Sequence, residues 1–223
     1  MKSSSTPLFL NRYDAGQQLA EQLTAYADRD DVLVMALPRG GVPVGYEVAQ
    51  WLHVPLDVFL VRKLGVPGQE ELAMGAIAAA GAATKPIRVL NRDVIRSHTI
   101  TTDVLETVTK RELRELERRD QLYRGGRAVP TVASRVVILV DDGLATGATM
   151  RAAIAALRVL KPAEIVIAVP VAVGDVCTAL TLVVDSVVCI ATPEPFYGVG
   201  LWYTDFSQTT DDEVRSLLAA SSC

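Results

Sequence analysis

The sequence is poor in the residues from which metal centres and redox sites are usually built. Its 223 residues include two histidines, His53 and His98, and three cysteines, Cys177, Cys189 and Cys223. Two histidines argue against a histidine-rich metal centre or a Ser-His-Asp triad, and the cysteines lack metal-binding spacing. An odd number of cysteines without such a framework indicates reduced thiols, so we expect a cytoplasmic protein.

The chain also lacks a basic excess and a long apolar run. Its 22 lysines and arginines face 26 aspartates and glutamates, and the pI is near 5.3. This balance argues against a nucleic-acid partner, which would normally meet a basic face. No apolar run reaches the roughly 18 residues of a membrane span, and the start lacks the apolar core of a signal peptide. Half of the residues are hydrophobic, enough for a sizeable core in one domain over residues 1–223.

Short apolar runs alternate with amphipathic segments along the chain. Strands are expected at 32–37, 55–61, 74–79, 87–90, 136–140, 164–171 and 185–191. Helices are expected from Asp14, as the cap, to about Tyr26, and at 42–52, 102–123, 150–160, 174–180 and 210–220. A polar loop is expected over 62–72, between the strands at 55–61 and 74–79. This order predicts an α/β fold with an open, mostly parallel sheet flanked by helices.

The stretch VVILVDDGLATGAT, residues 136–149, has the composition of a ligand site. A buried strand ends in Asp141 and Asp142, and a turn of small residues precedes the next helix. Such a turn lets backbone N–H groups converge on a phosphate. The turn residues proposed for this task are Ala145, Thr146, Gly147, Ala148 and Thr149. Two adjacent acids would repel a phosphate, so they should serve a diol or a divalent metal beside it. The stretch therefore predicts a phosphorylated-sugar site.

Two further strand ends carry cations. Arg39, Gly40 and Gly41 follow the strand expected at 32–37, and Arg62 and Lys63 follow the one expected at 55–61. The carboxyl ends of parallel strands lie on one edge of a sheet, so these loops are expected to meet the acidic one. Together they could hold a molecule with phosphates at both ends and a diol between them.

These motifs resemble those of the type I phosphoribosyltransferases. Residues 136–149 are similar to that family's signature for 5-phosphoribosyl-1-pyrophosphate (PRPP), and residues 37–41 resemble its pyrophosphate loop. Residues 62–68 resemble the start of the flexible loop of adenine phosphoribosyltransferases, the nearest members in motifs. The whole chain looks most like an uncharacterised bacterial branch of the family. In the family the pyrophosphate loop often holds a cis peptide bond, which alignment places at Pro38–Arg39.

The resemblance implies a function, with a role for each motif. Phosphoribosyl would pass from PRPP to an unidentified nitrogenous base, with pyrophosphate released and Mg²⁺ bridging ligand oxygens. Asp141 and Asp142 would bind the ribose hydroxyls, residues 145–149 the 5-phosphate, and Arg39, Gly40, Gly41, Arg62 and Lys63 the pyrophosphate. Glu71, or its neighbour Glu70, is the lid acid/base candidate, on a loop expected at 64–74. Phe196 or Trp202 would stack on the base within a hood formed by 193–206, to which 91–127 could contribute.

Other interpretations of the same residues stay open. Glu70 and Glu71 would serve equally as surface acids, and the aromatic residues of 193–206 as a core flap. The helix at 102–123 could be a hood, the arm of a homodimer or a solvated face. The chain could also be a PRPP-sensing regulatory or binding protein without turnover. A third class is an α/β enzyme that uses the small-residue loop for another phosphate ester.

Overall fold

The computed structural model describes residues 6–79 and 86–221, which fall into two compact units. The first unit comprises residues 1–58, 132–146 and 162–223, and the second comprises residues 59–131 and 147–161. The sequence shows no sign of this division, because each unit is assembled from separate stretches of chain. The hood segment predicted at 193–206 belongs to the first unit, and the segment 91–127 belongs to the second.

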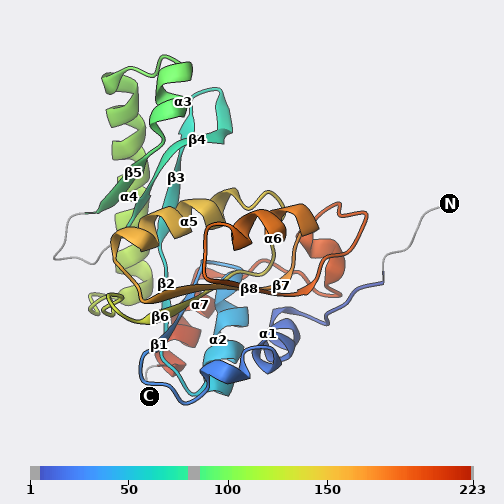
Figure 1. Ribbon diagram of the computed structural model, residues 1–223. Coiled ribbons are helices and arrows are strands. Elements are labelled where there is room, and N and C mark those ends of the chain that lie inside the picture. Colours follow the sequence, from blue (N-terminus) through green and yellow to red (C-terminus); the bar gives the residue numbers. More distant parts are fainter. Residues whose placement is uncertain (1–5, 80–85, 222–223) are drawn as a thin grey trace. The chain divides into compact units, whose positions relative to one another are not determined.

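The first unit is built on a parallel sheet of five strands in the order β2-β1-β6-β7-β8 (Figure 1). The strands are β1 (Val32–Ala36), β2 (Leu56–Val58), β6 (Val136–Val140), β7 (Glu164–Val171) and β8 (Ser186–Ala191). All four pairings between neighbours are parallel. The predicted open α/β sheet is thus confirmed.

Helices cover both faces of this sheet. The helices α1 (Arg12–Glu21) and α2 (Gly41–Leu52) lie on one face, and α6 (Gly174–Thr181) lies on the other (Figure 1). Side chains alternate across a strand, so Val34, Ile138 and Val166 pack on the same side as Leu19 and Val48. Strands buried on both faces are apolar throughout, which is why β1 and β6 have no polar residue.

The strand order reverses between β1 and β6. From β1 the chain moves outward to β2, whereas from β6 it moves the other way to β7 and then β8. Ala36 is paired with Val140, so these two strands end side by side. Ligands of open α/β sheets bind in the crevice at such a switch point. The loops that follow β1 and β6 are therefore the place to look for a site.

Two helix starts in the first unit are fixed by side-chain caps. The cap of α1 is Asn11, whose side chain accepts hydrogen bonds from the backbone of Tyr13 and Asp14, at 3.0 Å each. The prediction that Asp14 caps this helix was wrong, because Asn11 starts the helix one turn earlier. The helix expected over 210–220 is α7 (Asp211–Ala220), which opens on a capping box of Thr210 and Glu213. Short 3-10 turns occur at Thr24–Tyr26 and Val199–Trp202.

The second unit contains an antiparallel sheet of three strands, β3 (Val61–Val66), β4 (Gln69–Ala78) and β5 (Ile87–Leu90). The polar loop predicted over 62–72 is wrong, because β3 and β4 form a hairpin there. Its turn falls at Pro67 and Gly68, where Gly68 has φ +78°. Leu64 and Val66 are buried and lie on the same face of β3, so this segment forms a half-buried strand.

Three helices complete the second unit, α3 (Arg92–Ser97), α4 (Thr102–Arg124) and α5 (Ala148–Val159). The charged helix α4 packs against β3 and β4, and α5 contacts all three strands of the small sheet. The thin stripe of α4 is buried, with Leu105, Val108, Glu112 and Leu116 facing inward. Its other face carries the arginines and acids that the sequence predicts for a solvated helix.

Two further predictions concern membrane-spanning segments and the state of the cysteines. None of the helices in the described part of the chain combines the length and apolar character needed to cross a lipid bilayer. Cys177 and Cys189 are free thiols, whereas Cys223 lies outside the described residues.

Candidate functional site

The loop after β1 packs directly against the acidic loop after β6. Leu37 donates a backbone hydrogen bond to the carbonyl of Val140 at 2.8 Å. The peptide bond between Pro38 and Arg39 is cis, as the family resemblance predicts. A Cβ atom on Gly40 would overlap the carboxylate of Asp142, and one on Gly41 would lie 2.9 Å from the Cα atom of Asp141. Glycine is therefore required at both positions for this close approach.

Arg39, the predicted pyrophosphate ligand, points towards the start of α7. Its Nη1 atom lies 3.8 Å from Oδ1 of Asp211, and the Arg39 side chain is 31 % exposed. A contact of this length between partly exposed groups is weak. An anionic ligand could therefore compete for the guanidinium at modest cost.

Asp141 and Asp142 stand at the carboxyl end of β6, as predicted, but they differ in surroundings. The backbone N–H of Asp142 donates to Oδ1 of Asp141 at 2.9 Å. Arg12 donates to Oδ2 of Asp142 through Nε at 2.8 Å, and its Nη2 atom lies 2.8 Å from the same oxygen. The hydroxyl of Tyr203 donates to the backbone carbonyl of Asp142 at 2.6 Å. Asp142 is thus anchored by both its side chain and its backbone.

The electrostatics of the pair follow from burial. Burial raises the pKa of Asp141 well above its ordinary value, and the neighbouring charge of Asp142 raises that pKa further. Burial also raises the pKa of Asp142, but Arg12 opposes this rise. Burial and then the charge of Asp142 raise the pKa of the Tyr203 hydroxyl. A pair of acids held close together beside a cation is poised to accept hydrogen bonds from a neutral diol.

The small-residue loop continues from the acids into α5. Leu144 is bonded to the chain at the end of β7, since its N–H donates to the carbonyl of Val171 and its own carbonyl accepts from the N–H of Val173. A Cβ atom on Gly143 would contact Val199 of the segment 193–206. Gly147 has φ +67° and caps α5, which begins at Ala148. Residues 145 and 146 belong to the first unit and residues 147–149 to the second. A helix that opens on a small-residue turn presents backbone N–H groups to an anion.

The predicted residues of the second unit pair with one another or with α4. Arg62 donates through Nε to Oε2 of Glu112 at 2.8 Å, and the Glu112 side chain is only 8 % exposed. Lys63 forms an ion pair with Glu71 at 3.0 Å across the hairpin. The side chain of Glu70 accepts the N–H of Gly68 in the turn. The predicted roles of Arg62, Lys63 and Glu71 in ligand binding stay predictions.

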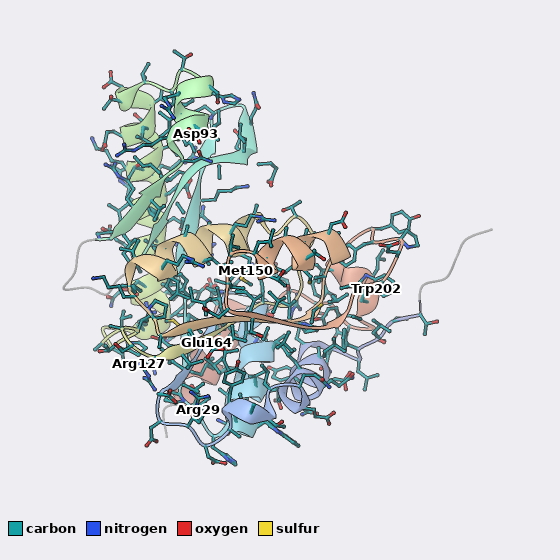
Figure 2. The ribbon with its side chains drawn as sticks, viewed as in Figure 1. Arg29, Asp93, Arg127, Met150, Glu164 and Trp202 are labelled. Atoms are coloured by element: carbon teal, nitrogen blue, oxygen red, sulfur yellow. The ribbon has the colours of Figure 1, made fainter. Side chains whose placement is uncertain are left out.

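The aromatic segment predicted as a base platform forms a cluster in the first unit. Phe9, Trp202 and Tyr203 are buried there, with Phe196 and Phe206 partly buried around them. Trp202, labelled in Figure 2, is 7 % exposed, and its ring centroid lies 6.3 Å from that of Phe196. Of the two rings predicted to stack on a base, the partly buried Phe196 is therefore more accessible to a ligand than Trp202.

Arg12 and Tyr203, which both hold Asp142, are not predicted from the sequence. Neither carries a local signal, since Arg12 is 130 positions and Tyr203 is 61 positions from Asp142 along the chain. Tyr203 lies within 193–206, the segment whose aromatic residues the sequence offers as a base platform or a core flap. The one signal for Arg12 is the pair of adjacent acids, which needs a cation to balance its charge.

Comparisons with known proteins agree with this geometry. A family model described as "Phosphoribosyl transferase domain" matches residues 9–178. The Mycobacterium tuberculosis protein named "Putative phosphoribosyl transferase Rv0571c" is 46 % identical over 211 residues, which are 95 % of this chain and 46 % of that protein. The chain thus spans about half the length of the curated relatives it matches.

Solved structures show the same relationship. The crystal structure of TT1426 from Thermus thermophilus superposes with a TM-score of 0.84 at 38 % identity, covering 95 % of this chain and 98 % of that one. AQ2163 from Aquifex aeolicus, with a TM-score of 0.52 at 10 % identity, covering 94 % of this chain and 85 % of that one, shares the fold alone. The fold defines an open α/β protein whose strand-end loops meet at a topological switch point. The chain belongs to the phosphoribosyl transferase domain family.

Proposed function

We propose that the chain transfers phosphoribosyl from PRPP to a nitrogenous base and releases pyrophosphate. The observation that carries this proposal is the packing of Gly40 and Gly41 against Asp141 and Asp142 at the switch point. This packing sets a candidate pyrophosphate loop beside a candidate diol site, as a ligand with a pyrophosphate at C1 of a ribose requires. In the reaction the bond from C1 to the pyrophosphate oxygen breaks, a bond from C1 to a base nitrogen forms, and the base loses a proton.

The residues of the first unit would act by positioning and by charge. Asp141 and Asp142 would accept hydrogen bonds from the ribose hydroxyls, and Arg39 with the N–H groups of Gly40 and Gly41 would hold the leaving pyrophosphate. Fixed donors and cations at a leaving group lower a barrier because they require no reorganisation during the reaction. Phe196 would stack on the acceptor base. Glu71 remains the acid/base candidate on the hairpin of the second unit.

In this proposal Mg²⁺ is carried mainly by PRPP. Among residues 6–79 and 86–221 no group of three or more His, Cys, Asp or Glu side chains could hold a metal ion. Mg²⁺ commonly keeps waters and binds through one or two carboxylates and the phosphates of a substrate. The nearby carboxylates suited to that limited role are Asp141 and Asp142. When bound, the ion would neutralise charge on the departing pyrophosphate.

A PRPP-consumption screen tests the proposal. Purine, pyrimidine and nicotinamide-type bases are each incubated with PRPP, Mg²⁺ and the protein, and pyrophosphate release is measured alongside calorimetric binding of PRPP. Base-dependent release supports the transferase. Tight binding without release for any base assigns the chain to PRPP-sensing proteins without turnover. Absence of PRPP binding would contradict both functions.

Asp141→Asn is the sharpest variant for the diol site. The amide keeps the acceptor for the N–H of Asp142 and leaves the Arg12 ion pair intact, whereas Asp142→Asn would remove the partner of Arg12. We expect about tenfold weaker PRPP binding near pH 8, because a hydrogen bond to a charged acceptor contributes about 1.5–3 kcal/mol. Calorimetry measures the affinity, and an unchanged thermal midpoint of unfolding confirms that the variant is folded. Equal affinities would contradict the assignment.

A further inference from the structure

Arg12 is a buried cation that the proposed reaction does not yet use. It is the first residue of α1, directly after the cap Asn11, and its side chain is only 10 % exposed. Charged side chains are rarely buried to this extent unless they are paired, because removal from water is costly. The partners of Arg12 should therefore explain why it lies there.

The guanidinium of Arg12 is held on three sides. Its Nε and Nη2 atoms both lie 2.8 Å from Oδ2 of Asp142, and Nη1 donates to the backbone carbonyl of Ser207 at 2.7 Å. The Cζ atom lies 3.8 Å from the centroid of the Phe206 ring. A planar group fixed by hydrogen bonds and by stacking has little freedom to rotate. Arg12 is thus a rigid support for whatever it touches.

The two oxygens of Asp142 are consequently unlike. Two nitrogen atoms of Arg12 contact Oδ2, while the Asp142 side chain as a whole is 17 % exposed. Within residues 6–79 and 86–221, the side-chain donors that contact this carboxylate belong to Arg12, and both lie on Oδ2. The fixed orientation of Oδ2 therefore determines where Oδ1 points.

The glycine loop leaves this pair no room to move. A Cβ atom on Gly40 would overlap the Asp142 carboxylate and lie 3.2 Å from Nε of Arg12. Tyr203 holds the backbone carbonyl of the same aspartate. The side chain of Asp142 is therefore fixed by Arg12 and confined by Gly40, and its backbone is fixed by Tyr203.

We propose that Arg12 is a positioning residue that orients Asp142 for one hydroxyl of a ribose, and thereby sets a preference for ribose over deoxyribose ligands. This inference rests on the proposed phosphoribosyl site. Without Arg12, the carboxylate would lose its orientation and its counter-charge while Asp141 stays beside it. A site built to bond a hydroxyl discriminates strongly against a ligand lacking it, and a disordered acceptor loses that discrimination.

The experiment compares calorimetric dissociation constants for ribose 5-phosphate, 2-deoxyribose 5-phosphate and 3-deoxyribose 5-phosphate. The wild type is expected to bind ribose 5-phosphate about tenfold more tightly than at least one of the deoxy analogues. In Arg12→Met this ratio is expected to fall to about threefold or less, and in Arg12→Lys to an intermediate value, because an ammonium cannot reproduce the guanidinium fork. A residue with only a structural role would weaken all three ligands equally and leave the ratio unchanged.

Tyr13→Phe is the matched control. It lies one position further along α1 and loses the hydrogen bond from its hydroxyl to Glu213 at 2.8 Å without touching Asp142. We expect a lower thermal midpoint with the wild-type ratio. If Arg12→Met does not fold, the ratio of dissociation constants measured for Arg12→Lys tests the positioning role instead. A wild-type ratio in a folded Arg12 variant overturns the positioning role alone, whereas a wild type that binds neither PRPP nor ribose 5-phosphate overturns the proposed function.

Discussion

At the scale of single residues, the candidate site depends on close approach more than on the number of polar groups. Gly40 and Gly41 bring a backbone loop against two carboxyls, and Arg12 supplies a cation that bonds one of them. Burial disfavours the charge on both acids, so their ionised forms depend on such partners. Any atom added between the loop and the acids should therefore disturb ligand binding before it disturbs the rest of the fold.

Gly40→Ala tests this dependence on space. The methyl group would overlap the carboxylate of Asp142, so the carboxylate and Arg12 must shift. We expect a loss of stability of about 1–3 kcal/mol, typical of overpacking, together with sugar-phosphate affinity at least about tenfold lower. Urea unfolding and calorimetry measure the two effects.

Gly174→Ala provides the comparison for that variant. Gly174 is the first residue of α6 in the same unit, and a Cβ atom there would have its nearest neighbour at 3.8 Å. This variant should retain wild-type stability and affinity. Similar behaviour of the two alanine variants would show that the approach at Gly40 is not tight.

At the scale of elements, the helix α4 supports the small sheet through a buried acid. Glu112 accepts from Arg62 of β3 and from Arg111 of its own helix, while Arg88 of β5 bonds Glu106 on the surface. The two glutamates lie on one helix and pair with arginines of one sheet, yet only Glu112 is buried. This contrast separates the effect of burial from the effect of pairing.

Glu112→Gln should destabilise the second unit more than Glu106→Gln does. Removing the charge of a buried acid leaves its arginine partner poorly compensated, although the partial exposure of Arg62 moderates the cost to about 1–2 kcal/mol. For Glu106→Gln we expect little or no loss of stability, because both groups of the pair are solvated. Hydrogen exchange of α4 and β3 amides reports the local change. Equal effects in the two variants would argue against a supporting role for Glu112.

At the scale of the whole molecule, the chain combines a parallel sheet unit and a hairpin unit within one family match. The match over residues 9–178 includes parts of both units. The candidate 5-phosphate turn, residues 145–149, is shared between them along the chain. A ligand that binds residues 145–149 of the folded chain should therefore raise the free energy of unfolding.

PRPP with Mg²⁺ should raise the thermal midpoint of unfolding. Ligand at about one hundred times its dissociation constant stabilises a protein by about 2.7 kcal/mol, or roughly 5–10 °C for a chain of this size. Chelation of the metal by EDTA should remove most of this gain if Mg²⁺ accompanies PRPP. The Asp141→Asn variant at the same ligand concentration should show a smaller shift. A full shift in the presence of EDTA would argue against the metal.

The sequence by itself determined the elements that depend on neighbours along the chain. Apolar runs predicted β1 and β6, and the helix expected over 210–220 is present as α7. Similarity of residues 37–41 to a known loop predicted the cis bond before Arg39. These features follow from periodicity, caps and motifs, which act over a few residues and so can be identified from local sequence.

Only the tertiary structure decided which distant groups meet. It paired Arg12 with Asp142, placed Arg62 against Glu112, and folded the expected loop at 62–72 into a hairpin. Each of these depends on packing that brings together residues 50 to 130 positions apart, or on a strand partner that a polar segment finds across a turn. The sequence therefore predicted a sugar-phosphate site, whereas only the fold showed which groups hold its two acids, because the partners of a buried acid are set by proximity in space.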